Sequence, residues 1–148
     1  MSPKPLEEII EELKSKHQYL TVSETGIMTV PLDKLVGFMQ ELRDNYHFNY
    51  LTNVTAADYL DYFEVIYNVS IVEHPHMLHI KARVERDNPV VPSMVPLWGG
   101  AIWQEREVYD LMGIKFESHP DLRRILLDDD WEGHPLRKDY QWEGGREE

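Results

Sequence analysis

The spacing of apolar residues changes along the chain, and each change marks an expected element. Near the start, apolar residues recur three and four positions apart with glutamates between them, which predicts an amphipathic helix over Leu6, Ile9, Ile10 and Leu13. A second stripe with the same spacing follows Pro31 and predicts a helix over Leu35, Phe38, Met39, Leu42 and Tyr46. Residues 19–22 and 27–30 flank a Glu-Thr-Gly turn between these helices, which favours a hairpin of two short strands.

Three longer strands are expected next, over residues 50–59, 63–71 and 77–85. The first is rich in Thr, Val and Tyr, and in the other two apolar residues occupy every second position. In the third, Leu78, Ile80, Ala82 and Val84 point to one face, and a polar, partly basic set points to the other. Short connections favour antiparallel neighbours, so the fold class expected is α+β: two layers, with a mixed, mostly antiparallel sheet and helices packed on one face.

The last third of the chain divides into a helix and a tail. Residues 88–92 contain two prolines and predict stiff extended chain, after which Ser93 can cap a short helix ending at Gly99 and Gly100. Residues 101–112 predict a helix that Gly113 ends in the left-handed conformation. Little periodicity follows, so we expect a single α+β domain over residues 1–117 and an extended C-terminal docking tail over residues 118–148.

Composition excludes several classes of protein. The formal net charge of −12 opposes binding to nucleic acid and to anionic lipid surfaces. The chain has no cysteine, which excludes disulfides, thiolate zinc sites and cysteine-ligated iron–sulfur clusters within it. No apolar run approaches the ~20 residues that span a bilayer, so direct membrane insertion is not expected. The standard phosphate-binding and serine-nucleophile motifs are also missing from the sequence.

Two glutamates in the helix over residues 101–112 suggest acid–base chemistry, but their geometry opposes it. Glu105 and Glu107 point about 160° apart on a helix and cannot act as a pair on one substrate. Glu105 falls within the apolar stripe, so we expect it to be buried with a guanidinium partner, Arg123 or Arg124. Arg106 and Asp110, four residues apart, are expected to form a solvated or interfacial pair.

Histidines and aspartates offer weaker candidate sites. A metal site at His74, His76 and His79 is disfavoured, because strand alternation separates His76 from His79 and places His79 beside basic residues. The default interpretation of His119-Pro120 and His134-Pro135 is a chain turn carrying a surface imidazole. The run Asp128-Asp129-Asp130 lacks the glycine and the final glutamate of a calcium loop and is expected to be a helix cap or a solvated stretch.

The tail carries residue types that concentrate at the centres of protein interfaces. Trp131, Tyr140 and Trp142 are interleaved with arginines and lysine, although the tail has few positions suited to a core. We therefore expect it to dock on another protein.

Residues 103–140 closely resemble the signature of the thirty-kilodalton subunit, or C subunit, of respiratory complex I. The resemblance is carried by Glu105-Arg106-Glu107, Asp110 to Ile114, Phe116, His119-Pro120, Leu122 to Leu126 and Trp131 to Tyr140, and extends loosely over nearly the whole chain. Ser118 and Asp128 depart from it, where the family usually has glycine and proline. The resemblance assigns a structural role to Glu105, Arg106, Glu107, Asp110, Gly113, His119, Pro120, Arg123 and Arg124. It assigns to the partner interface Trp131, His134, Pro135, Arg137, Lys138, Asp139 and Tyr140.

The resemblance implies a non-redox subunit in the peripheral arm of a membrane-bound NADH:quinone oxidoreductase, on the cytoplasmic side. It implies no catalytic residue, metal or cofactor in this chain, with FMN, iron–sulfur clusters and quinone held by partner subunits. The main partner expected is the larger D subunit of complex I, which forms the quinone pocket with the B subunit, together with neighbouring peripheral-arm subunits. Two alternatives remain: the corresponding subunit of an energy-converting hydrogenase, and a free-standing metal-dependent hydrolase.

Overall fold

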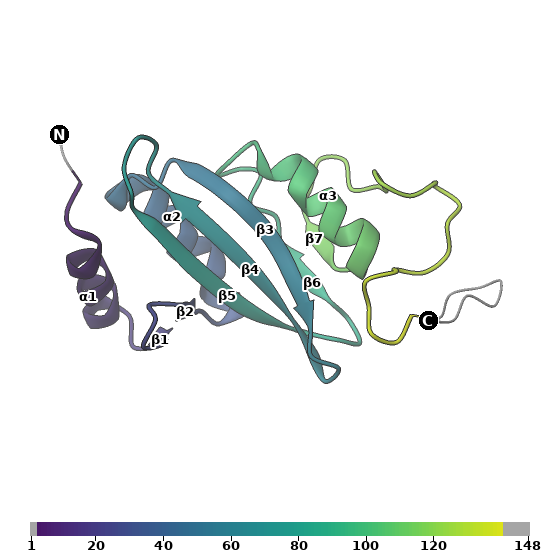
Figure 1. Ribbon diagram of the computed structural model, residues 1–148, viewed down its shortest axis with the longest axis horizontal. Coiled ribbons are helices and arrows are strands. Elements are labelled where there is room, and N and C mark those ends of the chain that lie inside the picture. Colours follow the sequence, from purple (N-terminus) through teal and green to yellow (C-terminus); the bar gives the residue numbers. More distant parts are fainter. Residues whose placement is uncertain (1–2, 141–148) are drawn as a thin grey trace.

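A five-stranded sheet with the order β1-β2-β5-β4-β3 forms the centre of the molecule (Figure 1). The structure, a computed structural model, describes residues 3–140. All neighbouring strands are antiparallel except β2 and β5, which are parallel. The strands are β1 (Thr21–Val22), β2 (Met28–Thr29), β3 (Tyr50–Asp58), β4 (Tyr62–Ser70) and β5 (Met77–Glu85). The predicted hairpin, the three longer strands and the α+β class are confirmed.

One face of this sheet is buried in the hydrophobic core. The register places Phe63, Val65, Tyr67 and Val69 of β4 opposite Val84, Ala82, Ile80 and Leu78 of β5, and all eight are buried. Helix α2 (Leu35–Tyr46), preceded by the 3-10 turn η1 (Leu32–Lys34), covers this face (Figure 1). Helix α1 (Leu6–Lys16) is joined to α2 by polar contacts of Lys16 with Glu41 and of Tyr46 with Glu12. The polar side chains of β5 face the other way, as strand alternation predicts.

Helix α3 (Ala101–Met112) lies alongside the edge strand β3 (Figure 1). An edge strand presents unpaired backbone groups, and the side chain of Gln104 meets one of them by accepting a 2.6 Å hydrogen bond from the Val54 N–H. Strands β6 (Val90–Pro92) and β7 (Lys115–Glu117) pair in parallel and hold the two ends of the α3 segment together. No helix within residues 3–140 is long and apolar enough to cross a membrane.

The short helix expected after Ser93 is absent, and a bend at residue 94 with turns at residues 95–97 and 99–100 takes its place. Ser93 does cap the local backbone, because its hydroxyl accepts a 3.1 Å hydrogen bond from the Val95 N–H. Its hydroxyl and the Met94 N–H also donate to Glu105, however, which draws this segment onto α3. That tertiary contact, with Pro96 and two glycines nearby, favours turns over a helix.

Gly113 ends α3 in the left-handed conformation that the sequence predicts, with φ of 78°. It also permits a close approach by the tail. A Cβ placed on Gly113 would lie 2.6 Å from an atom of the His134 ring and 2.8 Å from Arg137 Nη2. Both the backbone angle and the packing therefore require glycine at this position.

Alanine substitutions at two glycines should change stability in opposite directions. Gly113→Ala should lower the free energy of unfolding by at least about 1 kcal/mol, because an alanine resists positive φ and its methyl group collides with the tail. Gly37→Ala, in α2 where nothing approaches within 4 Å, should raise it by up to about 1 kcal/mol. Chemical denaturation of both variants measures this, and equal effects would contradict the requirement at Gly113.

Candidate functional site: a helix end closed by the tail

The C-terminal turn of α3 is closed by hydrogen bonds from residues that follow it. An α-helix leaves its last four carbonyl groups without partners inside the helix. In α3 all four find donors: Tyr109 O from the Gly113 N–H (2.8 Å), Asp110 O from Arg124 Nη1 and His134 Nδ1 (2.9 Å each), Leu111 O from the Leu136 N–H (2.9 Å) and Met112 O from Arg137 Nε (2.7 Å). Two of the donors are guanidinium groups, whose charge also suits the negative end of the helix dipole.

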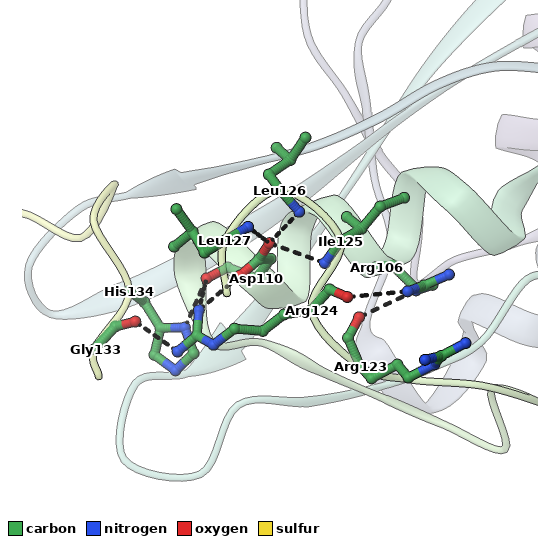
Figure 2. Close-up of polar contacts among 9 residues, drawn as sticks. All are labelled: Arg106, Asp110, Arg123, Arg124, Ile125, Leu126, Leu127, Gly133 and His134. Atoms are coloured by element: carbon green, nitrogen blue, oxygen red, sulfur yellow. Dashed lines mark hydrogen bonds and ion pairs between the residues drawn. The ribbon is translucent and has the colours of Figure 1, made fainter. Parts of the chain in front are cut away.

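The carboxylate of Asp110 is the centre of this closure (Figure 2). It is fully buried, and its Oδ1 forms an ion pair with Arg124, accepting a 2.6 Å hydrogen bond from Nη1. Oδ2 accepts the consecutive N–H groups of Ile125, Leu126 and Leu127 at 3.1, 2.7 and 3.0 Å. Burial alone raises the pKa of Asp110, but the arginine and the three N–H groups outweigh it and leave the pKa below its ordinary value.

Arg106 does not pair with Asp110, so that prediction is wrong. Its guanidinium is almost fully buried and donates to the carbonyls of Arg123 and Arg124, at 3.1 and 3.0 Å (Figure 2). Its face lies over the Trp103 ring, 5.2 Å from the ring centroid. Sharing the outer face of α3 predicts a solvated or interfacial pair, but the tail of the same chain crosses that face and encloses both residues.

Glu105 is buried as predicted, but its expected guanidinium partner is wrong. Its carboxylate accepts hydrogen bonds from the Ser93 hydroxyl (2.6 Å) and the Met94 N–H (2.7 Å). Arg124 binds Asp110 instead, and the exposed Arg123 side chain pairs with Asp121 at 2.8 Å. Glu105 faces the core, whereas the tail lies on the opposite side of α3. Burial raises the pKa of Glu105 to about 7 against the opposing effect of its two donors.

Both His-Pro pairs differ from the expected surface imidazoles. The partly buried His119 donates from Nε2 to the Ile102 carbonyl (2.9 Å) and accepts the Asp121 N–H at Nδ1 (2.9 Å), while Pro120 is exposed. His134 donates from Nδ1 to the Asp110 carbonyl and packs beside Tyr109. Burial, aided by the nearby arginines Arg124 and Arg137, lowers the pKa of His134. These imidazoles bind α3 to the chain that follows it.

A second anchor for the tail involves Asp58, which the sequence analysis did not single out. Its buried carboxylate pairs with Arg86 and accepts the N–H groups of Lys138 and Leu60, each at 2.8 Å. The Arg86 bond outweighs burial and, with the backbone donors, holds the pKa of Asp58 well below its usual range. Arg86 also reaches Asp139 at 3.2 Å. The only sequence signal for this site is the alternation of side chains along a strand. Asp58 pairs with the buried Phe63 on the neighbouring strand, so its side chain lies on the buried face of the sheet.

The residues assigned to a partner interface divide into two groups. His134, Arg137 and Asp139 bind the chain's own domain, as does the backbone of Lys138. Lys138 has an exposed side chain, whereas Trp131, Pro135 and Tyr140 are partly buried, and the Tyr140 ring lies beside Gly133. Trp142 lies outside the described residues. The partner assignment stays a prediction, and the structure adds that the same segment also packs on its own helix.

The other candidate sites can now be placed. Asp128, Asp129 and Asp130 are exposed, as expected of a solvated stretch. His76 donates to the Lys4 carbonyl, and His79 lies 2.5 Å from the side-chain oxygen of Asn68. Within residues 3–140 no group of three or more His, Cys, Asp or Glu side chains is arranged to hold a metal ion.

The family described as "Respiratory-chain NADH dehydrogenase, 30 Kd subunit" matches residues 28–146. The chain belongs to this family. A family member from Moorella thermoacetica, named as the C subunit of NADH-quinone oxidoreductase, is 42% identical over 95% of this chain and 99% of its own length. A member of the same name from Trichlorobacter lovleyi is 48% identical over 82% of this chain and 78% of its own. The resemblance seen in residues 103–140 is thereby confirmed.

Two solved structures share the fold of this chain. A structure described as a trypsin-resistant fragment of Nqo5 is 31% identical with a TM-score of 0.67, and the match covers 79% of this chain and 98% of the fragment. A chain from the membrane-bound sulfane sulfur reductase, an archaeal respiratory membrane complex, is 26% identical with a TM-score of 0.81, and the match covers 91% of this chain and 85% of that one.

Removing the Asp110 charge should release the tail. Asp110→Asn leaves Arg124 and three N–H groups facing a neutral amide, so residues 120–140 should open more often, with a cost to tail docking of about 3–5 kcal/mol. Trypsin should then cleave at Arg123 and Arg124 much faster. Asp128→Asn, at an exposed aspartate, is the matched control. Equal cleavage rates in the two variants would contradict the central role of Asp110.

The raised pKa of Glu105 should make the folded chain less stable as pH rises. Between the ordinary glutamate pKa of 4.5 and the folded value of about 7, the folded state binds more protons than the unfolded state. The contribution of Glu105 should therefore fall across this range, by roughly 3 kcal/mol at about 1.4 kcal/mol per unit of pKa, and level off above it. Thermal unfolding of the parent and of Glu105→Gln between pH 4.5 and 8 measures this. A variant with the parent's pH dependence would exclude Glu105 as its source.

Proposed function

We propose that this chain is a non-redox subunit in the peripheral arm of a membrane-bound NADH:quinone oxidoreductase. One observation carries the proposal: the match to the Moorella thermoacetica relative at 42% identity spans both chains almost completely. A correspondence over 99% of that protein's length places the whole of it in register with this chain. The chain would then work in the same kind of assembly, on the cytoplasmic side of the membrane.

The contacts of the site favour a structural role for this chain over a catalytic one. Arg106, Asp110 and Arg124 are fully engaged in holding the tail on α3, and Glu105 holds the turn after β6. The sequence has no cysteine to ligate an iron–sulfur cluster. We infer that this chain holds no cofactor of its own and that FMN, iron–sulfur clusters and quinone belong to partner subunits.

The partners we propose are the D subunit of complex I as the main contact, then the B subunit and others of the peripheral arm. The tail is the surface proposed to meet the D subunit. Its backbone is fixed to the domain at Leu136 and Lys138, while the Lys138 side chain is exposed. A rigid exposed segment loses little conformational freedom on binding, which favours association. The effect on the redox reaction would be indirect, through support of the protein that binds quinone.

A second candidate is a component of a related membrane assembly that uses another acceptor or donor. The observation favouring it is the structural match to a chain of the sulfane sulfur reductase over 91% of this chain. An energy-converting hydrogenase falls in the same class of alternatives. Sequence identity favours the quinone-reducing assembly, at 42% and 48% for two NADH-quinone oxidoreductase relatives against 26% for the reductase chain.

Purification of the native assembly through a tag on this chain tests the proposal. Solubilised membranes should yield the chain together with the D and B subunits, and the flavin and iron–sulfur absorbance should travel with the assembly and be absent from the isolated chain. Companions characteristic of a hydrogenase or a sulfur reductase would favour the second candidate. A chain that purifies alone would contradict both.

A charge reversal locates the contact. Lys138→Glu should reduce the recovery of the D subunit, because it changes an exposed tail charge and leaves the Lys138 backbone bond to Asp58 available. Lys14→Glu on α1, at the end of the molecule remote from the tail, is the control (Figure 1). Equal recovery of the D subunit with both variants would contradict the tail assignment.

A further inference from the structure

Glu107 is the charged residue of α3 whose side chain is not bound by any other group within residues 3–140. Glu105, Arg106 and Asp110 each make hydrogen bonds within the chain. Glu107 is partly buried, yet within residues 3–140 its carboxylate forms no hydrogen bond or ion pair. A carboxylate that is partly withdrawn from water is stabilised by a positive partner. The residues around Glu107 indicate what kind of positive group could reach its carboxylate.

Glu107 lines a groove between α3 and the edge strand β3. The groove has a volume of about 260 Å³, and its apolar wall includes Val108 and Leu111 of α3 and Leu136 of the tail. Leu136 is 59% exposed, although its backbone is fixed by the hydrogen bond to the Leu111 carbonyl. The volume falls below the roughly 300–1,000 Å³ of small-molecule pockets and suits a single long side chain.

On the side of β3, the groove also offers a backbone carbonyl group as a hydrogen-bond acceptor. The Val54 N–H points away from β4, because it bonds Gln104 Oε1 on α3. Backbone groups alternate in direction along an antiparallel strand, so the C=O of Ala56 points to the same side. The groove therefore combines an aliphatic wall, a carboxylate and a backbone carbonyl, and it lies on a protein whose net charge is −12.

We propose that this groove receives an arginine side chain from a partner subunit. The aliphatic stem packs on Leu111 and Leu136, and the guanidinium binds the Glu107 carboxylate, with N–H groups left for the carbonyl of Ala56. Arginine matches these features because it has an apolar stem and a planar head with five donors. The inference rests on the proposed function, since it assigns one contact of the proposed assembly.

Docking of the tail is a condition for this contact. The side chain of Leu136 forms part of the wall only while the Leu136 N–H bonds α3 and the neighbouring Arg137 bonds Met112. Release of the tail removes that wall and leaves Glu107 beside an open strand edge. The arginine site is thus complete only in a chain whose tail is closed.

Neutralisation of Glu107 tests the contact in the native assembly. Glu107→Gln should weaken retention of the partner by at least roughly tenfold, since one member of a partly buried charge pair is lost. The thermal midpoint of the isolated chain should stay unchanged, because Glu107 has no bond within residues 3–140 to lose. Glu24→Gln, at an exposed glutamate in the β1–β2 turn, is the matched control. Retention equal to that of the control would overturn the inference.

A photo-crosslinking residue at position 136 identifies the occupant. Cross-linked assembly should yield one partner peptide containing an arginine, and alanine at that arginine should weaken retention as Glu107→Gln does. Exchange of the charges, Glu107→Arg with glutamate at the partner position, should restore retention. A cross-linked peptide without arginine, or a failed exchange, would overturn the inference. If the parent chain recovers no other component of an oxidoreductase at all, the proposed function itself fails.

Discussion

Closure of the C-terminal end of α3 is the constraint on which the rest of the site depends. Buried carbonyl groups require donors, and α3 ends inside the protein with its last carbonyls turned toward the following segment. Arg124, His134, Leu136 and Arg137 supply those donors from a tail that has almost no regular structure of its own. These hydrogen bonds fix the position of the tail on α3. The tail in turn supplies the donors without which the last carbonyl groups of α3 could not be buried.

Two acids one and a half turns apart on α3 illustrate two ways of burying a carboxylate. Asp110 receives an arginine and three N–H groups, so its charged form is stabilised and its pKa falls. Glu105 receives two neutral donors and no cation, so burial prevails and its pKa rises. Asp110 is the permanent ionic anchor of the tail, whereas Glu105 changes its charge near neutral pH.

Local patterns in the sequence predicted α1, α2, α3 and the long strands well, since each depends on periodicity over a few residues, but not the turns after Ser93. The span of α3 and the left-handed Gly113 followed from apolar spacing and one glycine. Partners of the charged residues could not be predicted in the same way. Glu105 binds Ser93 instead of an arginine, and the tail binds Asp58, because of the side of α3 along which the tail runs. Helical projection places side chains around an axis, but it does not show what covers each face.

The contact between Gln104 and Val54 has a consequence for the newly made chain. One component of a large assembly exists alone for a time, and an open sheet edge exposes it to pairing with other unfinished chains. With α3 beside β3 and Gln104 occupying a backbone donor, a foreign strand cannot lie flat against that edge. The helix that carries the family signature therefore also covers a sheet edge that would otherwise be open to pairing with another strand.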